Sequence, residues 1–343
     1  MDRRTLLTGG ALVALAVPSL RAQARLEKPR IAIAVGDKSA FYFLPLTIAE
    51  RLGYFRAAGL DVVISDYGSG TLALQSLVGG TADVGSGAFR HTISLQSRGQ
   101  FFRAFAMQGR APQVVTGVSV RALPGYRGPA DLRGRRIGIT EPGSATHLAV
   151  AMLLARGGLR LDDATVVGVG TGAAAREALR SGEIEAICNV DPVITQLEQK
   201  GDLRVVSDTR TQKGTREMFG GPMPAGCLYA SDDFLQKHPR TAQALADAMV
   251  HALKWLQTAG PGDLLNTVPE AYLQGDRALY LASFQKVREA ISPDGLVEEE
   301  GARTAVRALT SFGFDPALRS AKIDPSRLYT NEFALRAKQK FQA

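Results

Sequence analysis

Short apolar runs alternate along the chain with segments in which apolar residues recur every three or four positions. Arg30-Ile31-Ala32-Ile33 and Arg136-Ile137-Gly138-Ile139 are two of these runs, and each is followed by a loop and a helix-like segment. Buried strands that alternate with amphipathic helices are typical of parallel sheets covered by helices. The pattern therefore predicts an α/β fold.

The same order of elements occurs twice. Residues 68–84 and 170–186 each contain a glycine-rich turn, an amphipathic helix, a glycine stop and the start of a strand. We interpret the copies as two α/β lobes with mainly parallel sheets, and a single continuous sheet is the alternative. Residues 233–258, 276–291 and 299–312 have helical spacing with few strand signals between them, so we expect helices that brace the sheets.

Most of the predicted strand-to-helix turns are glycine-rich or carry small hydroxyl-bearing residues. Ligands of open parallel sheets bind at such turns, where helix N-termini offer N–H groups and a partial positive charge to an anion. The same residue types also cap helices without any ligand. The candidate ligand-binding residues from these turns are Ser69, Gly70, Thr71, Ser86, Gly87, Phe89, Ser144, Ala145, Thr146, His147, Asn189 and Asp191.

Some candidates have two interpretations. Asp191 precedes Pro192 and either caps a helix or meets a cationic group of the ligand. His147 is equally explained as a surface histidine. Ser39, Phe41 and Tyr42 lie where the first copy is longer than the second, and the aromatic pair forms either core or a platform in the cleft. Arg90 and Arg110 either strengthen anion binding or are simply exposed.

Composition narrows the class of protein. The chain has 343 residues, 45% of them hydrophobic and 22% charged, and a net charge of +8. These values exclude collagen-like and disordered chains, and the scattered basic residues predict no nucleic-acid partner. Cys188 and Cys227 are too few and too far apart in sequence for a cysteine-rich metal site, and we expect free thiols rather than a disulfide. The catalytic motifs G-x-S-x-G, H-E-x-x-H and the P-loop do not occur in the sequence, so we expect no enzyme, cofactor or metal.

The N-terminus has the three regions of an export signal. Adjacent arginines, Arg3 and Arg4, precede a short apolar stretch, which ends at Ala22-Gln23-Ala24. The arginine pair resembles the twin-arginine class of signal. We expect residues 1–24 to be removed after about Ala24, and the mature protein to be periplasmic and not embedded in the membrane.

Several segments together resemble one family. Leu44-Pro45-Leu46-Thr47-Ile48-Ala49-Glu50, Gly53-Tyr54-Phe55 and Asp191-Pro192 are similar to segments of ABC-importer substrate-binding proteins of the nitrate, taurine and aliphatic-sulfonate type. Relatives of that family that bind pyrimidine precursors of thiamine share the pattern. The resemblance extends from about Ile31 to Trp255.

The resemblance implies a type II periplasmic binding fold, in which two lobes are joined by two crossing strands. It places lobe I at residues 25–112 and 230–343 and lobe II at residues 113–229. It also implies a receptor that carries a small organic anion, a sulfonate or carboxylate, to an ABC permease and its ATPase, and we expect the protein to be a monomer. The alternatives are a receptor for a pyrimidine or thiamine precursor, a ligand sensor for a membrane receptor, and an enzyme similar to thiamine-pyrimidine synthase.

Overall fold

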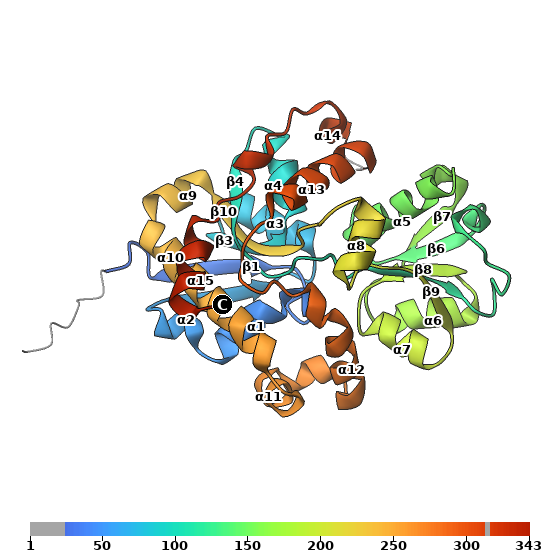
Figure 1. Cartoon of the computed structure of the whole chain (residues 1–343), viewed down its shortest axis with the longest axis horizontal. Helices are drawn as coiled ribbons and strands as arrows, with labels where there is room; N and C mark the ends of the chain where they lie inside the picture. The colour runs from blue at the N-terminus through green and yellow to red at the C-terminus, as the bar shows by residue number, and fades with distance from the viewer. Residues whose placement is uncertain (1–24, 313–315) are drawn as a thin grey trace, which may run out of the picture.

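The computed structural model describes residues 25–312 and 316–343. It contains two α/β lobes, which lie on the left and right of Figure 1. The expected export signal, residues 1–24, lies outside the described residues.

The first lobe is built on a five-stranded sheet with the order β2-β1-β3-β10-β4. β1 pairs in parallel with β2 and β3, whereas β10 pairs antiparallel with β3 and β4. The strands are β1 (Arg30–Val35), β2 (Asp61–Asp66), β3 (Val84–Ala88), β4 (Phe102–Met107) and β10 (Gly226–Ser231).

The second lobe repeats this arrangement. Its sheet has the order β7-β6-β8-β5-β9, in which β6 is parallel to β7 and β8, and β5 is antiparallel to β8 and β9. The strands are β5 (Val115–Ser119), β6 (Arg136–Ile139), β7 (Thr165–Gly168), β8 (Ala186–Asn189) and β9 (Leu203–Asp208). The structure thus has two separate sheets, as the repeat in the sequence predicts, and not one continuous sheet.

The chain passes between the lobes twice. It leaves the first sheet at Met107 and enters the second at Val115, and it returns between Asp208 and Gly226. β5 is therefore the first strand of the second sheet after the first crossing, and β10 is the strand by which the chain re-enters the first sheet. The lobe boundaries stay a prediction, and the expected boundary between residues 229 and 230 falls inside β10.

Helices cover both sheets. In the first lobe, α10 packs against α1, α2 and α15, while α3 and α4 contact β3 and β4 (Figure 1). The α-helices are α1 (Leu44–Arg51), α2 (Tyr54–Ala57), α3 (Gly70–Val78), α4 (Arg90–Gln96), α5 (Ala145–Arg156), α6 (Ala173–Ser181), α7 (Val193–Gln199), α8 (Gln212–Phe219), α9 (Asp232–Lys237), α10 (Pro239–Thr258), α11 (Pro261–Thr267), α12 (Arg277–Val287), α13 (Glu299–Phe312), α14 (Pro316–Ser320) and α15 (Glu332–Phe341). Short 3-10 turns occur at Phe41–Phe43, Pro129–Leu132, Leu161–Asp163, Glu270–Leu273, Arg288–Ala290 and Pro325–Arg327.

The helical segments expected after the second copy are present, with one correction. Residues 233–258 do not form a single helix, because α9 ends at Lys237 and α10 begins at Pro239. Proline has no N–H to donate within a helix and suits the first helical position, so a new helix starts there.

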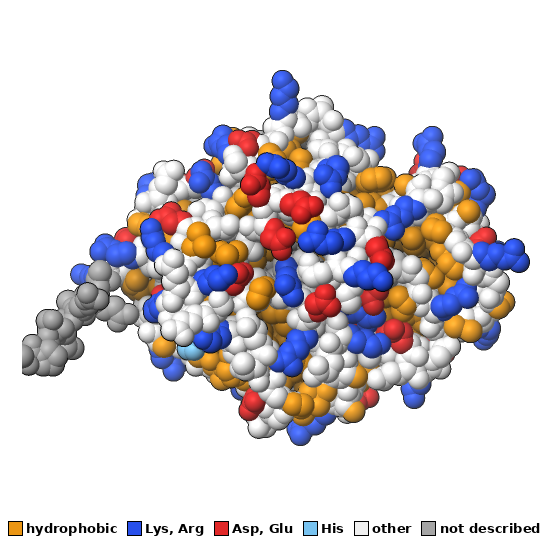
Figure 2. All heavy atoms as spheres, in the orientation of Figure 1, with side chains coloured by type: hydrophobic (Ala, Val, Ile, Leu, Met, Phe, Trp, Pro, Cys, Tyr) orange, Lys and Arg blue, Asp and Glu red, His pale blue; other side chains and the backbone are white. Residues whose placement is uncertain are grey.

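Charged side chains of both signs are distributed over the surface that Figure 2 shows, where Lys and Arg side chains are spread among Asp and Glu side chains. In the described part of the chain, no helix combines the length and the apolar character that crossing a membrane requires.

Candidate functional site

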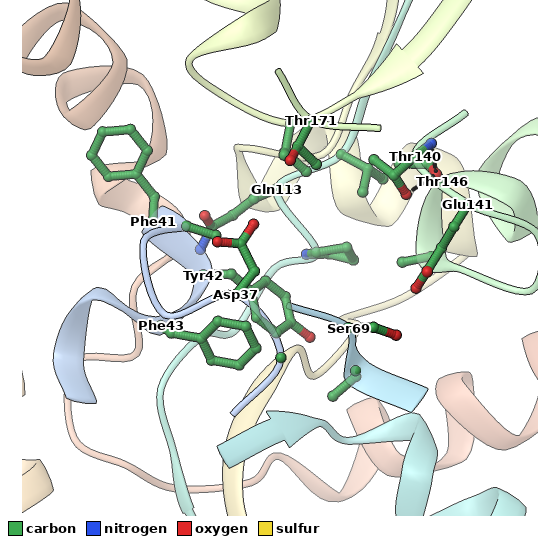
Figure 3. A pocket seen from close by; sticks show the side chains of 18 of the residues that line it. Asp37, Phe41, Tyr42, Phe43, Ser69, Gln113, Thr140, Glu141, Thr146 and Thr171 are labelled. Carbon is green, nitrogen blue, oxygen red and sulfur yellow. Dashed lines mark hydrogen bonds between the residues drawn. The ribbon is translucent and has the colours of Figure 1, made fainter. Parts of the chain in front are cut away.

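A cavity of about 280 Å³ lies between the lobes. The first lobe contributes the loop after β1, the start of α3 and Arg90. The second lobe contributes Thr140, Glu141, the start of α5 and the turn at Gly170 and Thr171. The first crossing segment, residues 112–114, also lines the cavity. We call this cavity the cleft, and Figure 3 shows its side chains.

A glycine sets the shape of one wall of the cleft. A Cβ atom at Gly36 would lie 2.3 Å from the backbone nitrogen of Gly70. Only glycine therefore allows the end of β1 to approach the start of α3 so closely. This approach brings the loop that carries Asp37 beside the turn of Ser69 and Gly70.

The structure brings about half of the predicted site residues to the cleft. Those that line it are Phe41, Tyr42, Ser69, Gly70, Ala145, Thr146 and Asp191. Thr71 and Ser144 line a second cavity of about 770 Å³, which shares Arg90 with the cleft. Contact of any of these residues with a ligand stays a prediction.

The remaining predicted residues do not line the cleft and have partners within the protein. Ser39 donates a hydrogen bond to Asp37 Oδ1 (2.7 Å), and Asn189 Nδ2 donates to the carbonyl of Gly170 (2.8 Å). His147 Nδ1 accepts a hydrogen bond from the backbone N–H of Gly143. Ser86 accepts one from Gln108, Gly87 packs against Tyr229, and Phe89 is fully buried in the core.

Three hydroxyl groups of the second lobe bond mainly to one another. Thr146 Oγ1 lies 2.8 Å from Thr140 Oγ1 and 2.7 Å from Ser144 Oγ (Figure 3 shows the Thr140–Thr146 contact). Ser144 Oγ also accepts a hydrogen bond from the backbone N–H of His147, as the N-cap of α5. Ser144 therefore caps a helix, as one of the two interpretations of these hydroxyl residues predicts.

Asp191 already has its partners within the protein. Its Oδ1 accepts a hydrogen bond from the N–H of Thr195, and its Oδ2 lies 3.1 Å from Arg210 Nη1. Burial would lower the pKa of Arg210, but Asp208, Asp191 and Glu198 outweigh it and raise that pKa. The helix begins at Val193 rather than at Pro192. Because Arg210 balances the carboxylate, Asp191 is poorly placed to recognise a cationic group of a ligand.

Arg90 is the cation of the cleft. Its Nε is fully buried and has no hydrogen-bond partner, and the described residues form no ion pair with it. Burial lowers the pKa of Arg90, an effect that Tyr42, Glu141 and Tyr229 oppose only in part. The side chain as a whole is half-buried, and a partly desolvated charge without an ion-pair partner costs free energy, so this guanidinium is suited to receive an anion.

Two cleft residues have strained backbones, and sequence reasoning did not select either. Asp37 has φ = +132° and Gln113 has φ = +61°, values that residues other than glycine rarely adopt. Gln113 is 3% exposed, and its side chain has no hydrogen-bond partner among the described residues. Such strain costs about 1–3 kcal/mol per residue and is common at functional sites. Nothing in the local sequence indicates that the backbone is strained at these two positions.

Aromatic side chains form another wall. Phe41 packs against Tyr280 with ring centroids 4.6 Å apart, and Tyr42 meets Phe43 edge-on at 5.0 Å. Burial raises the pKa of Tyr42 far above its ordinary value, so its hydroxyl stays protonated. Phe41 belongs to the core and lines the cleft at once, so the two interpretations offered by the sequence both apply.

The structure also shows where the two cysteines and the side chains that could bind a metal ion lie. Cys188 and Cys227 are free and buried in β8 and β10, and burial raises the pKa of both thiols. Across residues 25–312 and 316–343, no three His, Cys, Asp or Glu side chains are grouped so that they could hold a metal ion.

Comparisons with known proteins identify relatives. The model of the family described as NMT1/THI5 like matches residues 40–259. The 4-amino-5-hydroxymethyl-2-methylpyrimidine phosphate synthase of Schizosaccharomyces pombe is 24% identical over 218 residues, which are 61% of this chain and 60% of that protein. The chain spans about half to three-fifths of the length of the curated relatives it matches.

Solved structures share the fold. A protein from Bordetella bronchiseptica RB50 is 53% identical, with a TM-score of 0.85 over 93% of this chain and 100% of that one. The periplasmic aliphatic sulphonate binding protein SsuA of Escherichia coli is 20% identical, with a TM-score of 0.67 over 89% of this chain and 99% of that one. The fold is thus that of the periplasmic binding proteins, as the sequence predicts.

Proposed function

The chain belongs to the NMT1/THI5-like family, and on that basis we propose that it is a solute receptor, not an enzyme, which binds a small organic anion between its lobes. The anion is a sulfonate or a carboxylate. The receptor delivers it to an ABC importer from outside the cytoplasm. The sulfonate-binding neighbour of the same fold and the signal-like sequence of residues 1–24 support this location and partner.

Arg90 is the observation that carries the proposal. It places a guanidinium with a buried, unpartnered Nε in the wall between two cavities. The starts of α3, α5 and α6 lie around the cleft and add the partial positive charge of helix N-termini. An oxyanion would supply the hydrogen-bond acceptor that Arg90 lacks.

Binding on both walls would close the lobes. The cleft residues come from both lobes and from the crossing segment, so one ligand can touch all three. A ligand favours the closed form only through contacts that the open form does not provide. Closure is then a hinge motion about the two crossings.

The test combines a ligand screen with one substitution. A thermal-shift screen of sulfonates, carboxylates and pyrimidines should identify anions that raise the melting temperature. Arg90→Met should weaken their binding by about 10- to 100-fold, because hydrogen bonds to charged groups contribute about 1.5–3 kcal/mol. The melting temperature without ligand should not fall, since the variant removes a half-buried charge that has no ion-pair partner in the described structure.

Arg30→Met is the matched control. Arg30 pairs with Asp61 on the surface, far from the residues that line the cleft, so this variant should bind as the original protein does. Anion binding that survives Arg90→Met unchanged would remove the cleft cation from the site and refute the proposal.

A pyrimidine-precursor receptor is the second candidate. The similarity to a pyrimidine phosphate synthase and the wall of Phe41, Tyr42 and Phe43 favour it. The same screen separates the candidates, because an uncharged pyrimidine would bind independently of Arg90. Turnover of a pyrimidine by the purified protein would favour a synthase-like enzyme instead, and a partner receptor kinase in place of a permease would favour a sensor.

A further inference from the structure

The charges of the cleft do not suit a simple anion. The charged residues that line it are Asp37, Arg90, Glu141 and Asp191. Arg210 balances Asp191, which leaves Asp37 and Glu141 against a single cation. An anion without any other charge would gain from Arg90 but would be repelled by both carboxylates.

Asp37 is held towards the interior of the cleft at a cost. Its φ of +132° lies where glycine is the ordinary residue, yet the chain places a carboxylate there. Ser39 Oγ donates to Oδ1 at 2.7 Å, which orients the group. Within the described residues no cation pairs with Asp37, because the neighbouring Lys38 pairs with Glu50.

The surroundings of Asp37 lack the positive charge that a carboxylate ordinarily finds. Burial raises its pKa, and the charge of Asp66 adds to this effect against the hydrogen bonds from Ser39 and Ala40. Gln113, whose amide has no partner, points into the same region of the cleft (Figure 3). Asp37 and Gln113 together offer hydrogen-bond acceptors to a donor group of the ligand.

We infer that the ligand is amphoteric: an acidic group binds at Arg90, and an amine binds between Asp37 and the aromatic wall. Asp37 is then the residue that determines specificity for the amine. This inference rests on the proposed function, because it assumes that the cleft binds an organic acid. It adds that the acid must also carry a cationic nitrogen.

The experiment compares acids that differ only in an amino group. One pair is phenylalanine and 3-phenylpropanoate, with acid and amine near each other. The other is 4-(aminomethyl)benzoate and 4-methylbenzoate, with the groups at opposite ends of a ring. Isothermal titration calorimetry on the purified protein should show at least tenfold tighter binding of the amine-bearing member of one pair.

Substitutions then assign the preference to Asp37. Asp37→Asn keeps the size of the side chain and should reduce the preference to less than threefold. Asp37→Gly should do the same and raise the melting temperature, because glycine relieves the strained backbone, so lost preference cannot be attributed to misfolding. Asp61→Asn, which changes an exposed carboxylate on β2, is the control and should keep the preference.

The outcomes separate this inference from the proposed function. Equal or tighter binding of the amine-free acids, or a preference that persists in Asp37→Asn and Asp37→Gly, would overturn the inference and leave the anion receptor intact. If none of the four acids binds, the inference is overturned, while the wider anion screen with Arg90→Met decides the proposed function independently.

Discussion

Arg90 and Asp191 show how partners decide the role of a charged residue. Both follow the end of a strand and both line the cleft. Asp191 is balanced by Arg210 and bonded to α7, whereas the buried Nε of Arg90 has no partner. The loss of water around Nε therefore costs free energy at Arg90, and a ligand that accepts a hydrogen bond there would offset this cost. From the sequence, Asp191 is a candidate site residue and Arg90 is open as either a binding or an exposed residue, and only the contacts in the structure separate their roles.

Two hydroxyl residues of the second lobe allow stability and binding to be tested apart. Ser144→Ala removes the N-cap of α5 and should cost about 1 kcal/mol of stability with little change in affinity. Thr171→Val removes an exposed cleft hydroxyl that has no hydrogen bond within the described protein, and should weaken ligand binding about two- to tenfold at unchanged stability. Thermal denaturation and calorimetry of both variants check this. The same effect on both measurements in either variant would contradict the assignment.

At the scale of elements, hydrogen bonds from side chains outside a helix help to fix where that helix begins. Glu27 precedes β1 and reaches the start of α10, where its carboxylate accepts hydrogen bonds from the N–H groups of Arg240 and Thr241 and from the Arg240 side chain. The link holds the beginning of the described chain against a helix more than 200 residues later in the sequence. No local pattern in the sequence indicates this contact.

Glu27 gives stability a pH dependence. Burial would raise its pKa, but the hydrogen bonds from its own backbone, Arg240 and Thr241 outweigh burial and lower the pKa from 4.5 to about 2. A carboxyl group with a lowered pKa stabilises the fold above its ordinary pKa, and that contribution is lost as the pH falls towards the folded value. Glu27→Gln should thus lower the melting temperature at pH 7, and the difference from the original protein should shrink between pH 4.5 and about 2.

An exposed glutamate serves as the control for that measurement. Glu332 pairs with Arg336 one turn along α15, with both side chains more than half exposed. Such pairs contribute little to stability. Glu332→Gln should therefore leave the melting temperature nearly unchanged across the same pH range, and an equal effect in the two variants would contradict the role given to Glu27.

At the scale of the whole molecule, the C-terminal part of the first lobe also touches the second. Lys286 on α12 lies 2.6 Å from Glu198 on α7, and Glu289 accepts a hydrogen bond from the N–H of Gln212 at the start of α8. Figure 1 shows α12 next to α7 at the lower side of the junction. Arg216 on α8 also pairs with Glu300 on α13, and α13 contacts α5, so the C-terminal part of the first lobe touches the second on more than one side.

Gln113 on the first crossing tests how the junction contributes to binding. Gln113→Gly removes the cleft amide and relieves its positive φ, so affinity should fall several-fold while the melting temperature holds or rises. Gln274→Gly is the matched control, since Gln274 also has a positive φ (+49°) but is exposed and away from the cleft. It should change stability in the same direction and leave affinity unaltered. Loss of affinity in both variants would show that backbone flexibility, and not the amide, is responsible.

The sequence by itself determined the class of fold, the two copies and the turns from which the cleft is built. Apolar spacing and glycine stops are local, and they report directly on strands and helix ends. The turns at Ser69, Thr146 and Asp191 were found in this way.

The tertiary structure decided which side chains within those turns face the cleft and which of them are already satisfied. Ser86, Phe89 and Asn189 belong to the same kind of turn but are turned into the protein, where other segments bond or bury them. Asp37 and Gln113 gain their importance from backbone angles that the packing imposes, and Arg90 from the absence of a partner in the described structure. These properties depend on residues far apart in the chain, so no local pattern can carry them.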